Sequence, residues 1–225
     1  MLKISNRLCT AASYVRDGAV VADIGTDHAY LPIFLALNNR ISNAIASDIN
    51  EGPINKAREN IAKHNLNDKI YTCVANGLDG IENHAPTDIV ICGMGGELIA
   101  QIIDKSDYAK KQGIRLILQP MTSIKELREY LQNGFSIVDE DIVFEDNKIY
   151  QIICVEYDGI VREFNDIQLE LGPVNIEKGG ELFNMLLNSI IKKREKKLKG
   201  LIVGGYNTEE TEREIKELKK LFKGN

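Results

Sequence analysis

The feature that most constrains this sequence is a repeated alternation between short apolar runs and amphipathic stretches along its first 160 residues. The apolar runs cover residues 19–24, 43–47, 70–74, 88–92 and 114–118. Stretches with helical periodicity separate them, such as 53–64 and 97–104. Apolar runs without polar alternation are typical of strands that are buried on both faces. The order of these segments therefore predicts an α/β fold built on a parallel, doubly wound sheet.

The two ends of the chain depart from this rhythm. The apolar spacing of residues 3–17 predicts an amphipathic helix before the first strand. The strand-like runs 135–144 and 149–157 are joined by only four residues, which requires a hairpin and therefore an antiparallel last strand. Beyond residue 163, we expect two amphipathic helices over 181–199 and 209–223, with a glycine-containing turn over 200–208.

Charge divides the chain at the same place. Residues 161–225 carry 13 Lys and Arg against 11 Asp and Glu, a net charge of +2. Residues 1–160 carry 15 against 22, a net charge of −7. Such a split indicates two parts with different tasks. We therefore expect two domains, 1–160 and 161–225, of which the second is a helical hairpin.

Composition excludes several classes of protein. A hydrophobic share of 44% and a charged share of 27% are ordinary for a globular chain and rule out a disordered or fibrous one. No window approaches the ~20 apolar residues that span a bilayer, and the first residues lack the features of a signal peptide. The four cysteines lie far apart without a CxxC pair, which favours reduced thiols over a zinc site or a disulfide framework. We therefore expect a cytoplasmic monomer without a metal and without membrane attachment.

Polar residues follow the first two predicted strands at the points where ligands bind in open parallel sheets. Asp23 and Asp27 flank Gly25 within Asp-Ile-Gly-Thr-Asp, which is not the GxGxxG of a dinucleotide fold. The two carboxylates would repel a pyrophosphate, so the pattern disfavours NAD and FAD and favours a cationic ligand without phosphate. Asp48 follows the second strand at the distance expected of an acid that accepts hydrogen bonds from ribose hydroxyls.

The later strand ends add two amides and a glycine-rich turn. Asn76, after the third strand, is placed to contact an adenine edge. Residues 93–96 include three glycines, which let a backbone pass very close to a ligand. Gln119 follows the fifth run and precedes Pro120. Together with the carboxylates, these residues describe an adenosine ligand with a positive centre, which fits S-adenosylmethionine.

Each of these residues also has a structural alternative. Asp48 or Asp27 can be the N-cap of the helix that follows it, and His28 can be a hydrogen-bonded structural histidine. Glycine-rich turns are common in loops of every kind. The joint occurrence of these residues at successive strand ends is what favours a ligand site.

Five segments carry a family resemblance. They are DIGTDHAYLP (23–32), ASDINEGP (46–53), GMGG (93–96), QPM (119–121) and ELGP (170–173). Spread over nearly the whole chain, they resemble the TrmK family of bacterial tRNA (adenine-22-N1)-methyltransferases. Thr26 stands where that family usually has serine and keeps the hydroxyl. Met121 stands where asparagine is more familiar and removes a hydrogen-bonding side chain.

The resemblance implies a class I methyltransferase, with a seven-stranded Rossmann-like sheet, an antiparallel last strand and a coiled-coil-like helical appendage. Gly25 and its neighbours would lie against the methionine part of S-adenosylmethionine, Asp48 on its ribose and Asn76 near its adenine. The expected cofactor-binding residues are Asp23, Gly25, Thr26, Asp48, Ile49, Asn76, Gly77, Gly93, Met94 and Gly95.

The activity implied by the resemblance is transfer of a methyl group to N1 of adenine 22 in tRNA. Neutral adenine already carries a lone pair on N1, so positioning supplies most of the catalysis. A carboxylate near the base stabilises the positive charge that arrives on it, and Asp27 is the expected carboxylate. The other expected catalytic residues, which stack on the base or bond its edge, are His28, Tyr30 and Gln119.

A cluster of positive charge in the second domain predicts how the RNA is held. Six basic residues fall within eight positions of the long helix, where they contact phosphates or form a solvated face. The expected RNA-binding residues are Arg7, Lys192, Lys193, Arg194, Lys196, Lys197 and Lys199. Two other functions stay open at this point: methylation of another RNA or of a small molecule, and RNA binding without catalysis.

Overall fold

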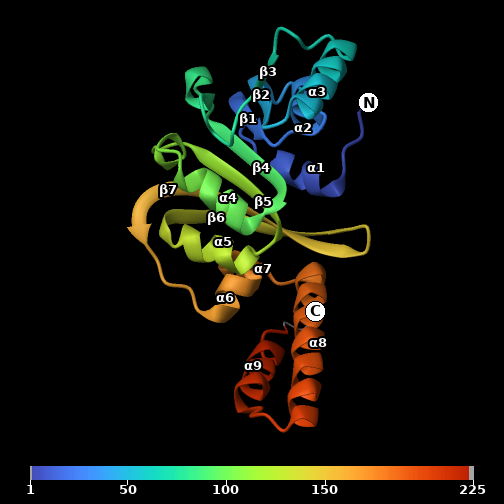
Figure 1. The fold of residues 1–225 in the computed structure, drawn as a ribbon, viewed down its shortest axis with the longest axis vertical. Coiled ribbons are helices and arrows are strands. Elements are labelled where there is room, and N and C mark those ends of the chain that lie inside the picture. Colours follow the sequence, from blue (N-terminus) through green and yellow to red (C-terminus); the bar gives the residue numbers. More distant parts are fainter. Residues whose placement is uncertain (1, 223–225) are drawn as a thin grey trace. The chain divides into compact units, whose positions relative to one another are not determined.

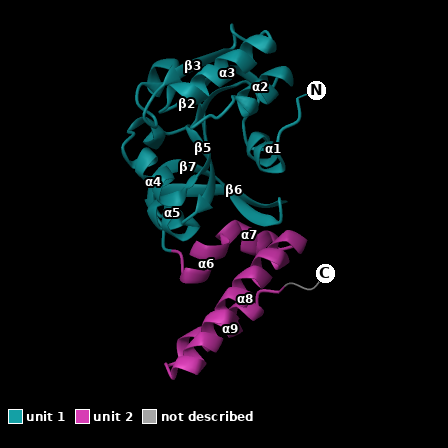
Figure 2. Ribbon diagram, turned by 45° about the vertical axis from the view of Figure 1, so that its right-hand side comes forward, with its two compact units in different colours: residues 1–163 teal, residues 164–225 magenta. Residues whose placement is uncertain are grey.

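The computed structural model describes residues 2–222. The chain divides into two compact units, of which the first ends at Glu163 and the second begins at Phe164 (Figure 2).

The first unit is built on a seven-stranded sheet with the order β3-β2-β1-β4-β5-β7-β6 (Figure 1). The strands are β1 (Ala19–Ile24), β2 (Ile41–Asp48), β3 (Ile70–Val74), β4 (Asp88–Gly95), β5 (Arg115–Thr122), β6 (Asn133–Glu145) and β7 (Lys148–Val161). β1 to β5 run parallel, and β7 is antiparallel to both of its neighbours. The chain winds outward from β1 to β3 and then returns to β4 on the other side of β1. The switch point therefore lies between β1 and β4, and the predicted sheet with its antiparallel last strand is confirmed.

Helices cover both faces of this sheet. They are α1 (Asn6–Ser13), α2 (Tyr30–Leu37), α3 (Glu51–Lys63), α4 (Gly96–Asp104) and α5 (Ile124–Leu131), with short 3-10 turns η1 (Ile81–His84) and η2 (Tyr108–Lys110). α1, α2 and α3 share one apolar core with Val21 and Val90, whereas α4 and α5 share another with Ala22 and Ile91. Because successive strand residues are buried on opposite faces, the strands have no polar side and appear as unbroken apolar runs.

The last two strands meet in a tighter turn than the sequence indicates. β6 ends at Glu145 and β7 begins at Lys148, so only Asp146 and Asn147 form the loop. Both have positive φ, 48° and 59°, as a two-residue type I′ hairpin requires.

The N-terminal helix is shorter than the predicted 3–17. The Ser5 side chain accepts a hydrogen bond from the backbone of Leu8 and starts α1 at Asn6. After Tyr14 the helix ends, because the Arg16 backbone N–H donates to the buried carboxylate of Asp88 at 2.8 Å. The Arg16 guanidinium also forms an ion pair with the Asp88 carboxylate. Both contacts hold the residues that follow α1 against the start of β4.

The second unit contains four helices among its described residues. They are α6 (Asp166–Leu171), α7 (Pro173–Lys178), α8 (Glu181–Gly204) and α9 (Glu209–Lys219). The predicted turn over 200–208 is wrong in its first half, since α8 continues through Gly200 and ends where Gly205 adopts φ +70°. Ion pairs Arg194–Glu214 and Lys219–Glu195 join α8 to α9, so the two helices form the predicted antiparallel hairpin.

Three further observations concern residues 2–222. No group of three or more potential ligand residues is arranged to hold a metal ion. No helix combines the length and apolarity that a bilayer crossing demands. The four cysteines are free thiols, with Cys154 buried and Cys9 exposed.

Candidate active site

The turn after β1 is a rigid loop at the switch point. Gly25 has φ +74°, which disfavours side chains larger than hydrogen. The backbone N–H groups of Gly25 and Thr26 both donate to the Ser47 carbonyl, at 2.8 and 2.9 Å. The Thr26 hydroxyl accepts a hydrogen bond from the backbone of Ala29 at 3.1 Å. These bonds tie the ends of β1 and β2 to the start of α2.

Asp23 is a buried carboxylate beside this turn. It is 8% exposed, and it forms no ion pair within residues 2–222. Burial raises the pKa of its carboxyl to about 6, against a smaller opposing effect of its hydrogen bond with Thr26. A buried negative charge without a cationic partner is costly, so the position favours a ligand that carries positive charge.

Met94 covers Gly25. A Cβ built on Gly25 would lie 2.0 Å from the Met94 methyl carbon, so the thioether packs directly on the glycine. The glycine-rich segment predicted to follow the fourth strand is instead the end of β4, and it touches the turn after β1.

Asp27, His28 and Tyr30 form an accessible group next to the buried carboxylate. His28 Nε2 lies 3.2 Å from Asp27 Oδ2, and the Asp27 side chain is 75% exposed. The rings of His28 and Tyr30 stack with their centroids 5.0 Å apart. α2 has Ala29 as its N-cap and no side-chain cap bond, so the structural alternative for Asp27 as a cap is wrong.

A cavity of about 230 Å³ joins these residues. Its lining residues are Arg7, Leu8, Asp23, Gly25, Thr26, Asp27, His28, Tyr30, Leu31, Cys92 and Gly93. Residues from α1, β1, α2 and β4 thus meet around one space. Leu8, Leu31 and Cys92 also line the cavity, although the sequence did not predict them as site residues. The spacing of apolar residues in α1 and α2 shows which helix face is apolar but not what that face covers. Cys92 belongs to β4, whose run is apolar on both faces.

Arg7 and Gln119 are placed differently from the sequence prediction. Arg7 is directed into the protein, where Nε donates to Glu145 at 2.7 Å and Nη1 donates to Gln119 at 2.8 Å. Gln119 is fully buried and also donates to the Pro120 carbonyl. With both ends of its amide occupied, Gln119 positions Arg7. Both side chains are thus engaged within the first unit, while the predicted roles of Gln119 in catalysis and of Arg7 in RNA binding stay predictions.

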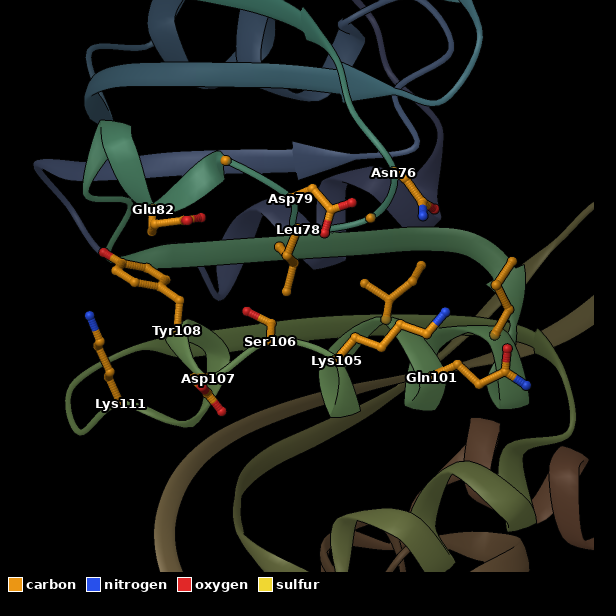
Figure 3. Close-up of a pocket in the computed structure, with 14 residues that line it drawn as sticks. Asn76, Leu78, Asp79, Glu82, Gln101, Lys105, Ser106, Asp107, Tyr108 and Lys111 are labelled. Carbon is orange, nitrogen blue, oxygen red and sulfur yellow. The ribbon is translucent and has the colours of Figure 1, made fainter.

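A second cavity, of about 440 Å³, begins where β3 ends (Figure 3). Asn76 and Gly77 line it together with residues of α4 and the segment that follows. In Figure 3, Asn76 and Gln101 lie at one end of this cavity, and Tyr108 and Lys111 lie at the other. The two cavities therefore divide the predicted cofactor residues, with Asp23, Gly25, Thr26 and Gly93 at the first and Asn76 and Gly77 at the second.

The remaining predicted cofactor residues lie at the same edge of the sheet. Asp48 Oδ1 accepts a hydrogen bond from the backbone of Asn50 at 2.7 Å, and α3 has Asn50, not Asp48, as its N-cap. Ile49 is 61% exposed beside it, an apolar surface available to a ligand. Gly95 precedes α4 as its N-cap.

The basic stretch of α8 separates into paired and unpaired charges. Arg194 is held by Glu170 at 2.9 Å and Glu214 at 3.0 Å, so its charge is used within the second unit. The other predicted RNA-binding residues of this helix are exposed and form no ion pair among residues 2–222: Lys192, Lys193, Lys196, Lys197 and Lys199.

Comparisons with known proteins agree with this geometry. The family described as "Methyltransferase domain" matches residues 4–153. The Bacillus subtilis (strain 168) tRNA (adenine(22)-N(1))-methyltransferase is 41% identical over 167 residues, which cover 71% of this chain and 70% of that protein. The crystal structure of the B. subtilis m1A22 tRNA methyltransferase TrmK superposes with a TM-score of 0.82 at 34% identity, covering 98% of this chain and 96% of the other. A Streptococcus pneumoniae protein crystallised with S-adenosyl-L-methionine superposes with a TM-score of 0.85 at 35% identity, over 97% and 99% of the two chains.

The fold, with its glycine turn and carboxylates at the switch point, defines a class I methyltransferase. Within that class, the chain belongs to the TrmK family of tRNA (adenine(22)-N1)-methyltransferases. The resemblance seen in the sequence is thereby confirmed, and so is the predicted fold class.

Proposed function

We propose that this enzyme transfers a methyl group from S-adenosylmethionine to N1 of adenine 22 in tRNA. Family membership supports the reaction and the cofactor. The observation in this structure that carries the proposal is Asp23, a buried carboxylate with a raised pKa and no cationic partner among the described residues. A sulfonium-bearing amino acid supplies the positive charge that this position lacks. A cytoplasmic location belongs to the same proposal, because the substrate is a tRNA.

The residues around the two cavities fit this cofactor by their chemistry. Asp23, Gly25 and Thr26 would hold its methionine part, and Asp48 would accept hydrogen bonds from its ribose. Asn76 and Gly77 would meet its adenine, with Ile49 as an apolar surface beside them. When bound, the cofactor supplies an electrophilic methyl group on sulfur.

Asp27, His28 and Tyr30 act on the target adenine. The base approaches with a lone pair on N1, so no residue has to remove a proton before transfer. The exposed carboxylate of Asp27 stabilises the positive charge that develops on the adenine ring. The stacked rings of His28 and Tyr30 offer a surface on which a base taken out of the RNA stack can rest.

Cys92 argues against methylation of a pyrimidine through a covalent bond between a cysteine and the base. A cysteine that attacks a pyrimidine must be a thiolate. Burial raises the pKa of the Cys92 thiol, and the negative charge of Asp23 raises it further. The thiol that lines the first cavity therefore stays protonated at neutral pH, which suits transfer to a nitrogen that needs no covalent activation.

The exposed lysines of α8 are proposed to contact tRNA phosphates. Five unpaired positive charges along one helix provide the sequence-independent part of RNA binding. That contribution offsets the few kcal/mol that exposing a stacked base costs.

Methyl transfer from labelled S-adenosylmethionine into an unmodified tRNA transcript tests the proposed function. We expect label in the transcript with adenine at position 22 and none when guanine replaces it. Equal labelling of the two transcripts, or 1-methyladenosine at another position, would contradict the assignment of the target.

A further inference from the structure

We propose that Arg7 binds the α-carboxylate of the methionine part of the cofactor through Nη2. The proposal rests on the proposed use of S-adenosylmethionine and adds a residue to its binding site. It also gives Arg7 a task other than RNA contact.

The charge of the first cavity supports this assignment. Asp23 and Asp27 suit the sulfonium and the ammonium group of the ligand, but both repel its carboxylate. Arg7 is the one arginine or lysine among the described residues that line the cavity. For a ligand with both charges on one carbon atom, Arg7 therefore offers the carboxylate a full positive charge within the cavity.

The donors that remain free also favour Arg7. Its Nε and Nη1 groups are bonded to Glu145 and Gln119, whereas Nη2 makes no hydrogen bond within residues 2–222. The backbone N–H groups of Gly25 and Thr26 are both bonded to the Ser47 carbonyl, so these two groups are not available to a carboxylate.

The guanidinium is held in place before any ligand arrives. Glu145 accepts from Arg7 at 2.7 Å and from the backbone of Asn6 at 2.7 Å, and these bonds hold the pKa of the Glu145 carboxyl below its usual value. The Tyr150 ring lies 4.7 Å from the guanidinium carbon. A planar fork fixed on one edge loses little conformational freedom when its other edge binds a carboxylate.

The test compares two ligands on two proteins by calorimetry. The ligands are S-adenosylhomocysteine and its decarboxylated counterpart, and the proteins are the full wild-type chain and Arg7→Gln. We expect the wild type to bind the carboxylated ligand about 10- to 100-fold more tightly, as one charged hydrogen-bonded contact provides. The Arg7→Gln variant is expected to bind both ligands with affinities within about twofold of each other.

Two results would overturn the proposal. One is a wild-type protein that binds both ligands equally. The other is an Arg7→Gln variant that loses the same factor for both, because Arg7 would then act through the position of α1. A wild-type protein that binds neither ligand would contradict the proposed function itself, and this inference with it.

Matched variants separate the carboxylate contact from the fold. Arg40→Gln removes an arginine that pairs with Asp17 before β2, at the opposite edge of the sheet, and should leave the preference for the carboxylated ligand unchanged. Arg7→Lys keeps the charge without the fork and should retain a reduced preference, about three- to tenfold. Glu145→Gln loosens the guanidinium and should also reduce the preference without abolishing it. If Arg7→Lys matches Arg7→Gln for both ligands, the charge has no part in binding and the proposal is wrong.

Discussion

Asp23 and Asp27 are four residues apart in the sequence but lie in opposite environments. Asp23 is 8% exposed and has a raised pKa, whereas the Asp27 side chain is 75% exposed. The difference arises because Asp23 is still part of β1, between two parallel strands, while Asp27 follows the turn at Gly25. A buried carboxylate suits a fixed cation, and an exposed one can meet an incoming substrate.

Replacing Asp23 should stabilise the ligand-free protein while weakening cofactor binding. The folded pKa of about 6 lies above the unfolded value of 3.8, so ionisation of Asp23 disfavours the folded state as pH rises between these values. We expect Asp23→Asn to increase the free energy of unfolding by about 2–3 kcal/mol at pH 7.5. Most of that gain should be lost at pH 4.5, where Asp23 of the folded wild type is already protonated and Asp23 of the unfolded chain begins to bind its proton. Urea denaturation at the two pH values measures the effect, and Asp68→Asn, at an exposed site, is the control. A gain that does not change with pH would show that charge burial is not its cause.

Replacing Asp27 should lower the rate of methyl transfer and leave the affinity for the cofactor unchanged. We expect Asp27→Asn to lower kcat for tRNA methylation by about 10- to 100-fold, because the amide keeps the shape but loses the charge that stabilises the methylated base. The affinity for S-adenosylhomocysteine, measured by calorimetry, should change by less than about twofold. Unchanged kcat with normal cofactor binding would remove Asp27 from the mechanism.

The junction of β4 and α4 shows how two nearby glycines serve different purposes. Gly93 has φ +83°, lines the first cavity and has open space around the position of a Cβ. Gly96 is buried at the start of α4, where a Cβ would lie 2.1 Å from the Ser123 carbonyl oxygen. Gly96 therefore allows α4 to pack on the turn before α5, and this packing fixes the segment that carries Gly93.

Adding a methyl group at Gly96 should separate these two elements. We expect Gly96→Ala to lower the free energy of unfolding by about 1–3 kcal/mol, since the Ser123 carbonyl oxygen cannot move without shifting the turn. Gly52→Ala in α3 is the matched control, because nothing lies within 4 Å of its Cβ position and alanine favours a helix. Thermal denaturation distinguishes the two variants. Equal stability of both would mean that the close approach at Gly96 does not constrain the fold.

At the scale of the whole molecule, the two units carry different charges. Residues 1–160 have a net charge of −7, which would repel a polyanion, and the unpaired lysines of α8 lie in the second unit. The acidic unit carries the predicted cofactor-site carboxylates, and the basic unit carries the lysines proposed to contact tRNA phosphates.

Removing two of these lysines should weaken tRNA binding without touching the cofactor site. We expect Lys192→Gln with Lys196→Gln to lower tRNA affinity about tenfold and to reduce the dependence of log K on log salt by roughly 2. The double variant Lys56→Gln with Lys63→Gln removes the same charge from exposed positions of α3, in the first unit, and should have a smaller effect. Titration of labelled tRNA at several salt concentrations measures both. Equal losses for the two pairs would indicate net charge, and not a binding surface on α8, as the cause.

The sequence by itself determined which segments form the sheet and that its last strand is antiparallel, because strands buried on both faces must be apolar and the short link before β7 permits only a hairpin. The order of the strands in the sheet came from the tertiary structure. The sequence also determined which strand ends carry carboxylates and glycines. Only the tertiary structure decided what each side chain faces: Gln119 is buried against Arg7, Arg194 is paired within the hairpin, and α8 continues through Gly200. The physical reason is that strand formation depends on local burial patterns, whereas the partner of a polar side chain often comes from a different element that the fold brings near, as β6 brings Glu145 to Arg7.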